Sequence, residues 1–214
     1  ESFSGSTFVD STDSIQDAYS LRCAPQIHGG VRETIDFSRK VIEREVNAAT
    51  DNPLIFEPGI AISGGNFHGE PVGLVMDYLS IALCELGAIA ERRIFRMTDG
   101  KLNVGLPPML VDSQEKAGLN SGMMMLQYTA ASLVLENQTL ATPDSVHSLP
   151  TSAEQEDHNA NAMTAARHAA MIIDNLQQIL GIEIYMATRA MDLRMRLQNG
   201  KMGRFSQMLY DKIR

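Results

Sequence analysis

The chain has 214 residues, of which 44% are hydrophobic, 21% charged and 6% aromatic, and this is the composition of an ordinary globular domain rather than of a disordered or fibrous chain. Eighteen Lys and Arg residues against 26 Asp and Glu residues leave a formal net charge of -8, so charge disfavours nucleic acid and anionic membranes as partners. The two cysteines, Cys23 and Cys84, belong to no Cys-x-x-Cys or closely spaced Cys/His pattern. We therefore expect no structural metal and a reducing, cytoplasmic compartment.

The beginning of the chain is polar. Residues 1–20 are rich in Ser, Thr, Asp and Gly without a helical period, which predicts a loop, and no signal peptide is recognisable there. From Glu33 to Thr50 the apolar residues approximate a 3.6-residue spacing, and Asp51-Asn52-Pro53 then ends the predicted helix because a residue before proline is disfavoured in the α region. We therefore divide the chain into a lead-in loop over residues 1–32 and a helical-bundle portion over residues 33–214.

A small β-hairpin follows the first predicted helix. Two short apolar runs, Leu54–Phe56 and Ile60–Ile62, flank a Pro-Gly turn at residues 58–59. A second helix is predicted from Glu70 to about Met97, because Pro71 suits a first helical turn and the apolar residues recur in steps of three and four.

We expect this second helix to pack in a bundle rather than to cross a membrane. Its most apolar part, Val72–Ala90, carries Asp77 and Glu85, and no stretch of the chain reaches about 18 uncharged apolar residues. A third helix is predicted over residues 120–141, where Pro143 closes it.

The last predicted helix is the longest. Its apolar period extends from Asn159 to Leu197 without an internal proline. At 1.5 Å per residue such a helix is roughly 58 Å long, whereas a compact domain of this length is about 44 Å across. We therefore infer an elongated helical bundle whose core is completed by other chains or by further sequence.

Four clusters of chemically capable side chains interrupt the helical pattern, and each also has a purely structural interpretation. The first places Gln16, Tyr19 and Arg22 within seven residues. Arginine can bind a carboxylate through two hydrogen bonds and tyrosine can transfer a proton, but the same segment could be a hydrogen-bonded loop. The second, residues 63–70, is rich in glycine and precedes a helix; it could bind an anion, although a tight turn is the simpler interpretation.

The third cluster is the acidic run Glu154–His158 before the longest helix. It could simply complement the helix dipole, or its carboxylates could bind amides, imidazoles or amines. The fourth, Asn47–Pro53, is readable as a helix stop. The three consecutive methionines at positions 123–125 are interpreted as adaptable core residues rather than as a cofactor or metal site.

Taken together, these clusters resemble a known family. The chain from about Gln16 to Arg194 resembles the later half of the histidine ammonia-lyases, a branch of the aromatic amino acid lyase family in the fumarase/aspartase-like superfamily. Eight strings occur in the same order, which is highly specific. They are QDAYSLRC (16–23), NAATDNPLIF (47–56), ISGGNFHGEP (62–71), ERRI (91–94), LPP (106–108), SLVLEN (132–137), SLPTSAEQEDH (148–158) and RHAAMIIDN (167–175).

The resemblance implies an all-α fold, an elongated long-helix bundle with one small β-hairpin, of which this chain is the central part of a larger lyase domain. It also implies a carbon-nitrogen lyase that releases ammonia from a small-molecule amino acid, histidine being favoured and urocanate its product. Family members are homotetramers whose active sites each draw on three subunits. The implied partners are therefore the amino acid, the missing N-terminal part of the same chain and further copies, with no nucleic acid or membrane.

The family's electrophile is a methylidene-imidazolone (4-methylideneimidazole-5-one, MIO), made from an internal Ala-Ser-Gly. No Ala-Ser-Gly occurs in these 214 residues; Phe3-Ser4-Gly5, Ile62-Ser63-Gly64 and Asn120-Ser121-Gly122 each lack the alanine. We therefore read the sequence as a C-terminal portion of a longer polypeptide and expect it to be inactive alone.

Five residues inherit roles from the resemblance. Tyr19 matches the tyrosine that accepts or donates a proton beside the substrate's β-carbon or amino group, and Arg22 the arginine that binds the substrate carboxylate. Gln16 matches a glutamine supporting the carboxylate or the tyrosine, and Phe67 the phenylalanine near the electrophile and the substrate ring. Glu156 matches the acid that addresses the substrate imidazole, and this position is the main reason to favour histidine, because a carboxylate facing a benzene ring would be buried without a partner.

One departure and three alternatives remain open. After Glu156-Asp157-His158 the chain reads Asn159-Ala160-Asn161-Ala162-Met163, where histidine ammonia-lyases more often read Val-Ser-Met, so the pocket wall beside Glu156 can differ. A tyrosine or phenylalanine lyase or aminomutase of the same family is the nearest alternative. A cofactor-free superfamily lyase would need a lysine after its signature loop, which is absent, and the third alternative is a noncatalytic helical scaffold or fragment.

Overall fold

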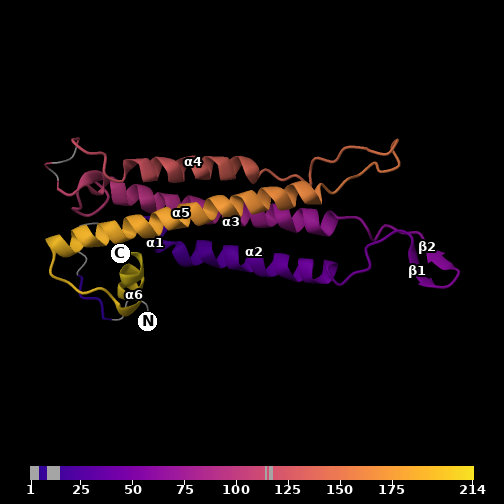
Figure 1. Ribbon diagram of the computed structural model, residues 1–214, viewed down its shortest axis with the longest axis horizontal. Coiled ribbons are helices and arrows are strands. Elements are labelled where there is room, and N and C mark those ends of the chain that lie inside the picture. The colour runs from indigo at the N-terminus through magenta and orange to yellow at the C-terminus, as the bar shows by residue number, and fades with distance from the viewer. Residues whose placement is uncertain (1–4, 9–14, 114, 116–117) are drawn as a thin grey trace. The chain divides into compact units, whose positions relative to one another are not determined.

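The computed structural model describes residues 5–8, 15–113, 115 and 118–214. These residues are mostly helical, with one two-stranded antiparallel sheet (Figure 1), and this confirms the predicted all-α class with a small hairpin. The elements in chain order are α1 (Tyr19–Arg22), α2 (Ala24–Glu45), β1 (Leu54–Glu57), β2 (Ile60–Ile62), α3 (Glu70–Thr98), the 3-10 turn η1 (Pro108–Leu110), α4 (Met124–Leu140), α5 (Ala162–Leu197) and α6 (Arg204–Ile213).

The chain forms two compact units, and each is described by itself. Unit 1 comprises residues 1–24, 87–134 and 177–214, and unit 2 comprises residues 25–86 and 135–176. Helices α3, α4 and α5 each contribute one part to each unit. The predicted division into a lead-in and a single bundle portion stays a prediction.

Unit 1 has a helical core. Ile94 of α3 and Ile179 and Met186 of α5 are fully buried, at positions where helical periodicity places apolar side chains on one face. Truncating one of them to alanine typically costs 2–5 kcal/mol. The same cluster includes Ala90, Leu106, Leu110, Ala130, Val134, Ala190 and Leu193.

Unit 2 packs α2 against the first half of α3. The Ser38 hydroxyl donates to the Val75 carbonyl at 3.3 Å, and the rings of Phe37 and Tyr78 meet edge to face with centroids 6.2 Å apart. The carboxylate of Asp77 is buried in this unit and accepts the backbone N–H groups of residues 144 and 145 at 3.0 and 2.8 Å. A buried carboxylate with two donors is stabilised, which explains a charge within an apolar helix.

α3 is long and apolar enough to cross a membrane, judged by length and composition alone. The buried core helix of a water-soluble protein meets the same criterion, and α3 contributes buried residues to both units. The length and hydropathy of α3 are therefore weak evidence that it crosses a membrane.

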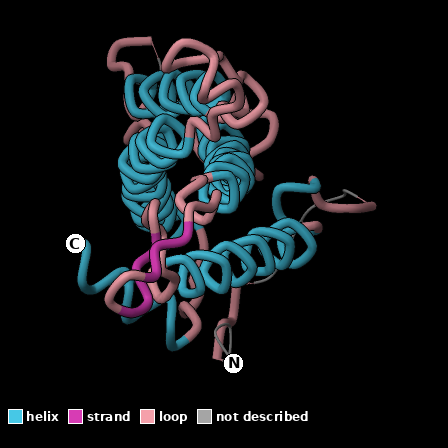
Figure 2. Tube along the Cα trace, turned by 90° about the vertical axis from the view of Figure 1, so that its right-hand side faces the viewer, coloured by secondary structure: helices cyan, strands magenta, loops and turns pink. Residues whose placement is uncertain are grey.

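The hairpin is confirmed at its predicted place. Leu54 pairs with Ile62 and Ile55 with Ala61, with an irregularity before Glu57. Figure 2 shows the two strands in magenta. Asn52, in the cluster interpreted as a helix stop, closes it, because its side-chain oxygen accepts hydrogen bonds from the Ser63 hydroxyl and the Gly64 N–H at 3.0 and 3.1 Å.

The predicted loop over residues 1–32 is wrong for residues 19–22 and 24–32, which are helical. The buried face of α2 begins at Val31 and continues through the small polar residues Thr34 and Ser38. Because large apolar residues are sparse there, their periodicity predicts a helix that begins later than α2 does. The helix also ends at Glu45 rather than Thr50, because the amide of Asn47 donates to the carbonyl of Glu43 and supports a turn there.

The remaining helices were predicted with small errors. α3 agrees with its expected bounds, while α4 begins at Met124 rather than 120 and α5 at Ala162 rather than 159. α6 was not predicted. Its ten residues are amphipathic, but they are shorter than the windows in which helical periodicity is persuasive.

Candidate functional site

The first site segment is the single helical turn α1 in unit 1. Tyr19 and Arg22 are three residues apart and therefore share one helical face. The guanidinium carbon of Arg22 lies 4.7 Å from the centroid of the Tyr19 ring, within the range of a cation–π contact. The Tyr19 side chain is 68% exposed and Arg22 is also exposed. α1 therefore presents a phenol and a guanidinium together.

An ion pair anchors α1 to the rest of unit 1. Arg93 of α3 forms two hydrogen bonds with the Glu183 carboxylate of α5, one of them 3.0 Å long between Nη2 and Oε2. The same arginine donates from Nη1 to the carbonyl of Ser20 at 3.3 Å. Both charged side chains are less than one-fifth exposed, so the pair is poorly screened. No spacing in the sequence indicates this pair, although Arg93 lies within the ERRI string.

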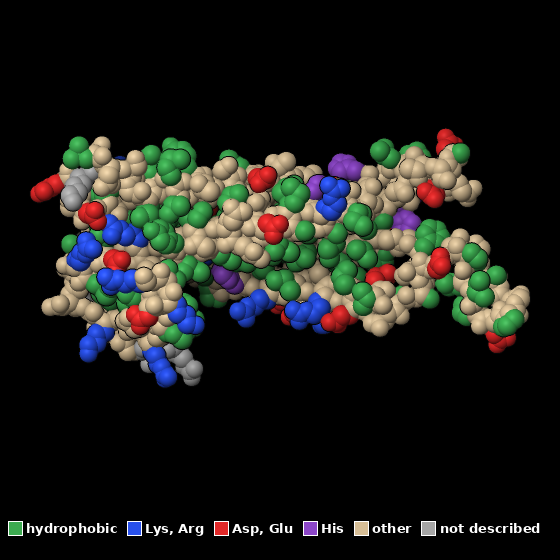
Figure 3. Space-filling view, in the orientation of Figure 1, with side chains coloured by type: hydrophobic (Ala, Val, Ile, Leu, Met, Phe, Trp, Pro, Cys, Tyr) green, Lys and Arg blue, Asp and Glu red, His purple; other side chains and the backbone are tan. Residues whose placement is uncertain are grey.

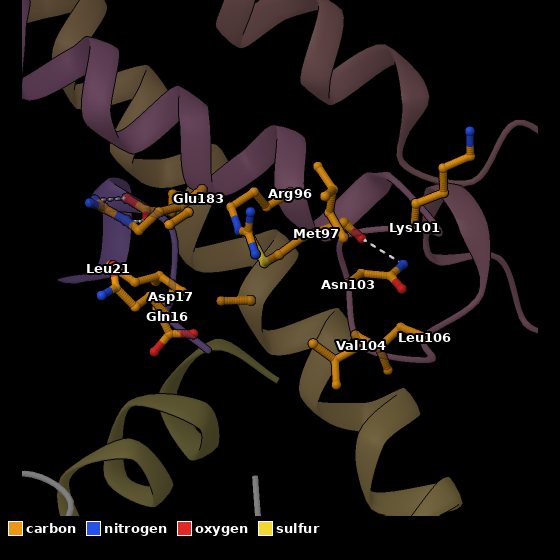
Figure 4. Close-up of a pocket in the computed structure, with 14 residues that line it drawn as sticks. Gln16, Asp17, Leu21, Arg96, Met97, Lys101, Asn103, Val104, Leu106 and Glu183 are labelled. Carbon is orange, nitrogen blue, oxygen red and sulfur yellow. Dashed lines mark hydrogen bonds and ion pairs between the residues drawn. The ribbon is translucent and has the colours of Figure 1, made fainter. Parts of the chain in front are cut away.

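A cavity of about 960 Å³ in unit 1 lies beside this segment (Figure 4). Gln16, Asp17 and Leu21 line this cavity. Arg96, near the end of α3, and Lys101, just after α3, also line it. Tyr19 and Arg22 are not among its lining residues. Of the three residues predicted in this segment, the structure thus places Gln16 at the cavity and the other two on the exposed face of α1.

The second site segment lies in unit 2, where Phe67 precedes α3. Its ring is 51% exposed. The neighbouring His68 accepts the Glu70 N–H at Nδ1 over 3.2 Å, and its Nε2 lies 2.9 Å from the carbonyl oxygen of His158. Because Nδ1 is an acceptor, Nε2 carries the proton and donates to that carbonyl. The two imidazole rings are stacked with centroids 5.8 Å apart.

The histidine contact joins the two unit 2 segments that carry predicted site residues. Phe67 is adjacent to His68, and Glu156 is two residues before His158. His68 and His158 each belong to one of the eight matching strings, but no spacing in the sequence indicates that the two side chains meet.

Glu156 lies in a tight turn of unit 2. The backbones of Thr151 and Glu156 exchange two hydrogen bonds of 2.9 and 3.3 Å. Between them Ser152, Ala153 and Glu154 all have φ between 52° and 66°, a left-handed conformation that is uncommon for residues other than glycine. The Glu156 side chain is exposed. The predicted N-terminal cap of the long helix is therefore an irregular loop, and α5 begins six residues later.

In the described part of the chain, no three His, Cys, Asp or Glu side chains are grouped so that they could hold a metal ion. The chemistry available at the two segments is that of a phenol, a guanidinium, an aromatic ring and a carboxylate. Tyr19 and Arg22 lie in unit 1, Phe67 and Glu156 in unit 2, and their roles in one site stay predictions.

The whole chain, residues 1–214, matches the family model described as aromatic amino acid lyase. The chain belongs to this family. A histidine ammonia-lyase of Caldanaerobacter subterraneus subsp. tengcongensis is 54% identical over 188 residues, which are 87% of this chain and 36% of that protein.

Solved structures support the family assignment. Histidine ammonia-lyase from Trypanosoma cruzi has a TM-score of 0.84 and 41% identity, covering 92% of this chain and 38% of that one. Pantoea agglomerans phenylalanine aminomutase has a TM-score of 0.85 and 35% identity, and the match covers 96% of this chain and 40% of that one. The family assignment is thus confirmed, and the chain spans about two-fifths of the length of these relatives.

Proposed function

We propose that the chain is the later part of a histidine ammonia-lyase, which eliminates ammonia from L-histidine to give urocanate. The observation that carries this proposal is the pairing of a phenol and a guanidinium on one turn of α1. In unit 2, Glu156 separately offers an exposed carboxylate. The similarity to histidine ammonia-lyases at about half identity supports the choice of substrate.

Arg22 would bind the carboxylate of the substrate. Its guanidinium is exposed on α1 and can form two parallel hydrogen bonds with a carboxylate. Anchoring that end of the substrate fixes the β-carbon relative to Tyr19, the neighbour of Arg22 on the helix face. Holding reacting groups in place can account for several kcal/mol of the barrier.

Tyr19 would remove the proton from the β-carbon. The electron pair of that C–H bond forms the new double bond to the α-carbon as the C–N bond breaks, and the amine leaves as ammonia. The guanidinium carbon of Arg22 lies 4.7 Å from the centroid of the Tyr19 ring, so the group that would bind the carboxylate and the group that would take the proton are neighbours. Proton transfer by a positioned group typically contributes 10²–10⁴-fold to a rate.

Glu156 would recognise the imidazole ring by accepting its N–H. A carboxylate is an acceptor with several lone pairs, and Glu156 is exposed in its turn. Phe67, also exposed, would contact the ring, an interaction worth about 1 kcal/mol. Gln16 would support the carboxylate or the tyrosine from the same segment as Arg22.

The family's methylidene-imidazolone would be supplied by sequence outside these 214 residues, since no Ala-Ser-Gly occurs within them. When present, this group withdraws electrons from the substrate amine and makes it a better leaving group. The residues of this chain that would lie beside such a group are Tyr19 and Phe67, both of which are exposed.

We further propose that the active protein is a cytoplasmic homotetramer that also contains an N-terminal part outside these 214 residues. Exposed apolar side chains on the hairpin support this, because a two-stranded hairpin is barely stable alone and exposed apolar patches mark interaction surfaces. Several such side chains are visible on the molecular surface (Figure 3). Those on the hairpin are Ile55, Phe56, Ile60 and Ile62.

The decisive experiment assays the full-length protein with histidine, tyrosine and phenylalanine. We expect ammonia and urocanate from histidine, and a Glu156→Gln variant should lose most of its preference for histidine. Cinnamate or coumarate, or a β-amino acid, would instead indicate a phenylalanine or tyrosine lyase or an aminomutase. We expect no turnover by the 214-residue chain alone, because it lacks the source of the electrophile; activity of that piece would contradict the proposal.

A further inference from the structure

The turn that carries Glu156 is held by two side chains to which the proposed reaction gives no role. The amide nitrogen Nδ2 of Asn159 lies 3.4 Å from the Thr151 hydroxyl and 3.4 Å from the Glu156 carbonyl, and it also donates to the carbonyl of Leu149. The backbone N–H of Asn159 donates to the Ser148 hydroxyl at 2.7 Å. One residue therefore contacts both ends of the segment from 148 to 156.

The Thr151 hydroxyl in turn contacts the Glu156 carboxylate. Oγ1 of Thr151 lies 2.9 Å from Oε2 of Glu156. A carboxylate is an acceptor only and an amide nitrogen a donor only, so the direction is fixed. Asn159 donates to the threonine hydroxyl, and that hydroxyl donates its single proton to Oε2 of Glu156.

This relay occupies one oxygen of Glu156 and fixes the plane of its carboxylate. Within the described residues, the structure records a side-chain hydrogen bond at Oε2 and none at Oε1. The remaining oxygen can then accept a hydrogen bond from a ligand. A flexible glutamate on an exposed loop would lose side-chain entropy on binding, whereas a carboxylate oriented beforehand loses less.

The backbone around the relay is strained and closely packed. Three consecutive left-handed residues, 152–154, persist only where surrounding contacts determine the conformation. The segment beyond Asn159 lies tightly against α3, because a Cβ at Gly73 would come 2.6 Å from the carbonyl oxygen of Ala160. The backbone next to Asn159 is therefore closely packed against α3, which restricts the position of the Asn159 side chain in the turn.

We propose that Asn159 and Thr151 are positioning residues that orient the Glu156 carboxylate toward the imidazole N–H of the substrate. This inference rests on the proposed function of Glu156. It adds a specificity-determining relay in which the asparagine amide acts through the threonine hydroxyl, and neither side chain needs to touch the substrate.

The test compares Thr151→Val with Thr151→Ser in the full-length enzyme. Valine has the shape of threonine without the hydroxyl, whereas serine keeps the hydroxyl. We expect the valine variant to raise the KM for histidine about fivefold, the usual effect of one lost hydrogen bond, with kcat changed less than about twofold and the serine variant close to wild type. Phenylalanine, which has no imidazole, is measured as a competitive inhibitor, and its inhibition constant should not change.

Asn159→Ala should shift the KM for histidine in the same direction, and Asn161→Ala is its matched control. Asn161 donates to the carbonyls of Asp144 and His147, so it holds the same loop without contacting Thr151 or Glu156. If both alanine variants lower the melting temperature but only Asn159→Ala raises the KM for histidine, the relay is supported.

Three outcomes would overturn the inference. A valine variant with unchanged KM would show that the hydroxyl does not orient Glu156. Parallel changes for histidine and phenylalanine would show a general distortion of the pocket rather than a relay. If the wild-type enzyme forms no urocanate, the proposed function itself fails and the inference fails with it, whereas active wild type with unaffected variants rejects the relay alone.

Discussion

The two segments that carry the proposed site are fixed in different ways. In α1 backbone groups form hydrogen bonds with one another: the N–H groups of Leu21 and Arg22 both donate to the Ala18 carbonyl, at 3.0 and 2.9 Å. The turn around Glu156 has left-handed residues instead of a helix, and the Asn159 side chain adds hydrogen bonds to the carbonyls of Leu149 and Glu156. A helical turn needs only its spacing to bring two residues together, whereas an irregular turn needs particular partners elsewhere in the sequence.

Removing the phenol of α1 is expected to have the largest effect. In the full-length enzyme, Tyr19→Phe should lower kcat about a hundredfold or more, because the variant cannot accept the β-proton. The KM should change little, since Arg22 still binds the carboxylate. Steady-state kinetics with histidine measures both constants.

The control for this variant is its melting temperature. The Tyr19 side chain is 68% exposed and its ring faces the Arg22 guanidinium, so folding should be little affected by loss of the hydroxyl. A Tyr19→Phe enzyme that retains wild-type kcat would show that α1 presents its phenol to something other than the β-carbon.

The anchor of α1 gives the next largest effect. Glu183→Gln leaves the guanidinium of Arg93 partly buried without its carboxylate, and removal of one partner of such a pair is destabilising. We expect the free energy of unfolding of the full-length protein to fall by about 2 kcal/mol, measured by urea denaturation. The KM for histidine should also rise, because Arg93 supports the Ser20 carbonyl beside Tyr19.

A double variant separates charge from packing at this anchor. Arg93→Met combined with Glu183→Leu removes both charges, and we expect it to be more stable than Glu183→Gln alone, since no unpaired charge remains. If the single variant is as stable as wild type, the ion pair does not anchor α1, and the contrast between the two segments would need another explanation.

The same contrast explains what could be predicted from the sequence. The hairpin, α3 and the end of α5 followed from turn residues and periodicity, because those patterns are local. The start of α2 did not, because Thr34 and Ser38 are small polar residues in its buried stripe. Tyr19 and Arg22 were singled out as close in the sequence, but the helical turn that sets them on one face was predicted as a loop.

The surroundings of Glu156 could not be predicted in that way. The contacts of His68 with His158, 90 residues away, and of Asp77 with residues 144 and 145 depend on tertiary packing. The left-handed residues 152–154 include no glycine that would have signalled them. Local backbone contacts of one helical turn therefore hold the proposed catalytic phenol, while the orientation of the proposed recognition carboxylate depends on the tertiary fold.

α6 lies between these two cases, because it is a regular helix that a side-chain contact holds in place. A variant of this contact is expected to have the smallest effect on stability. The hydroxyl of Tyr210 donates to the Asp192 carboxylate of α5. This hydrogen bond raises the pKa of Tyr210, with burial and the charge of Asp192 adding to the rise, while Arg214 opposes it. The neutral phenol is thus favoured in the folded state.

The sign of the pH effect follows from that raised pKa. Below the ordinary tyrosine pKa of about 10, the contribution of Tyr210 to stability is fully present, and it is lost as the pH rises through the higher folded pKa. Urea denaturation across this range should therefore show a steeper alkaline loss of stability for wild type than for Tyr210→Phe. Tyr128→Phe, at an exposed tyrosine of α4, is the matched control and should keep the wild-type slope. Equal slopes for wild type and Tyr210→Phe would mean that the contact with Asp192 does not hold α6 in place.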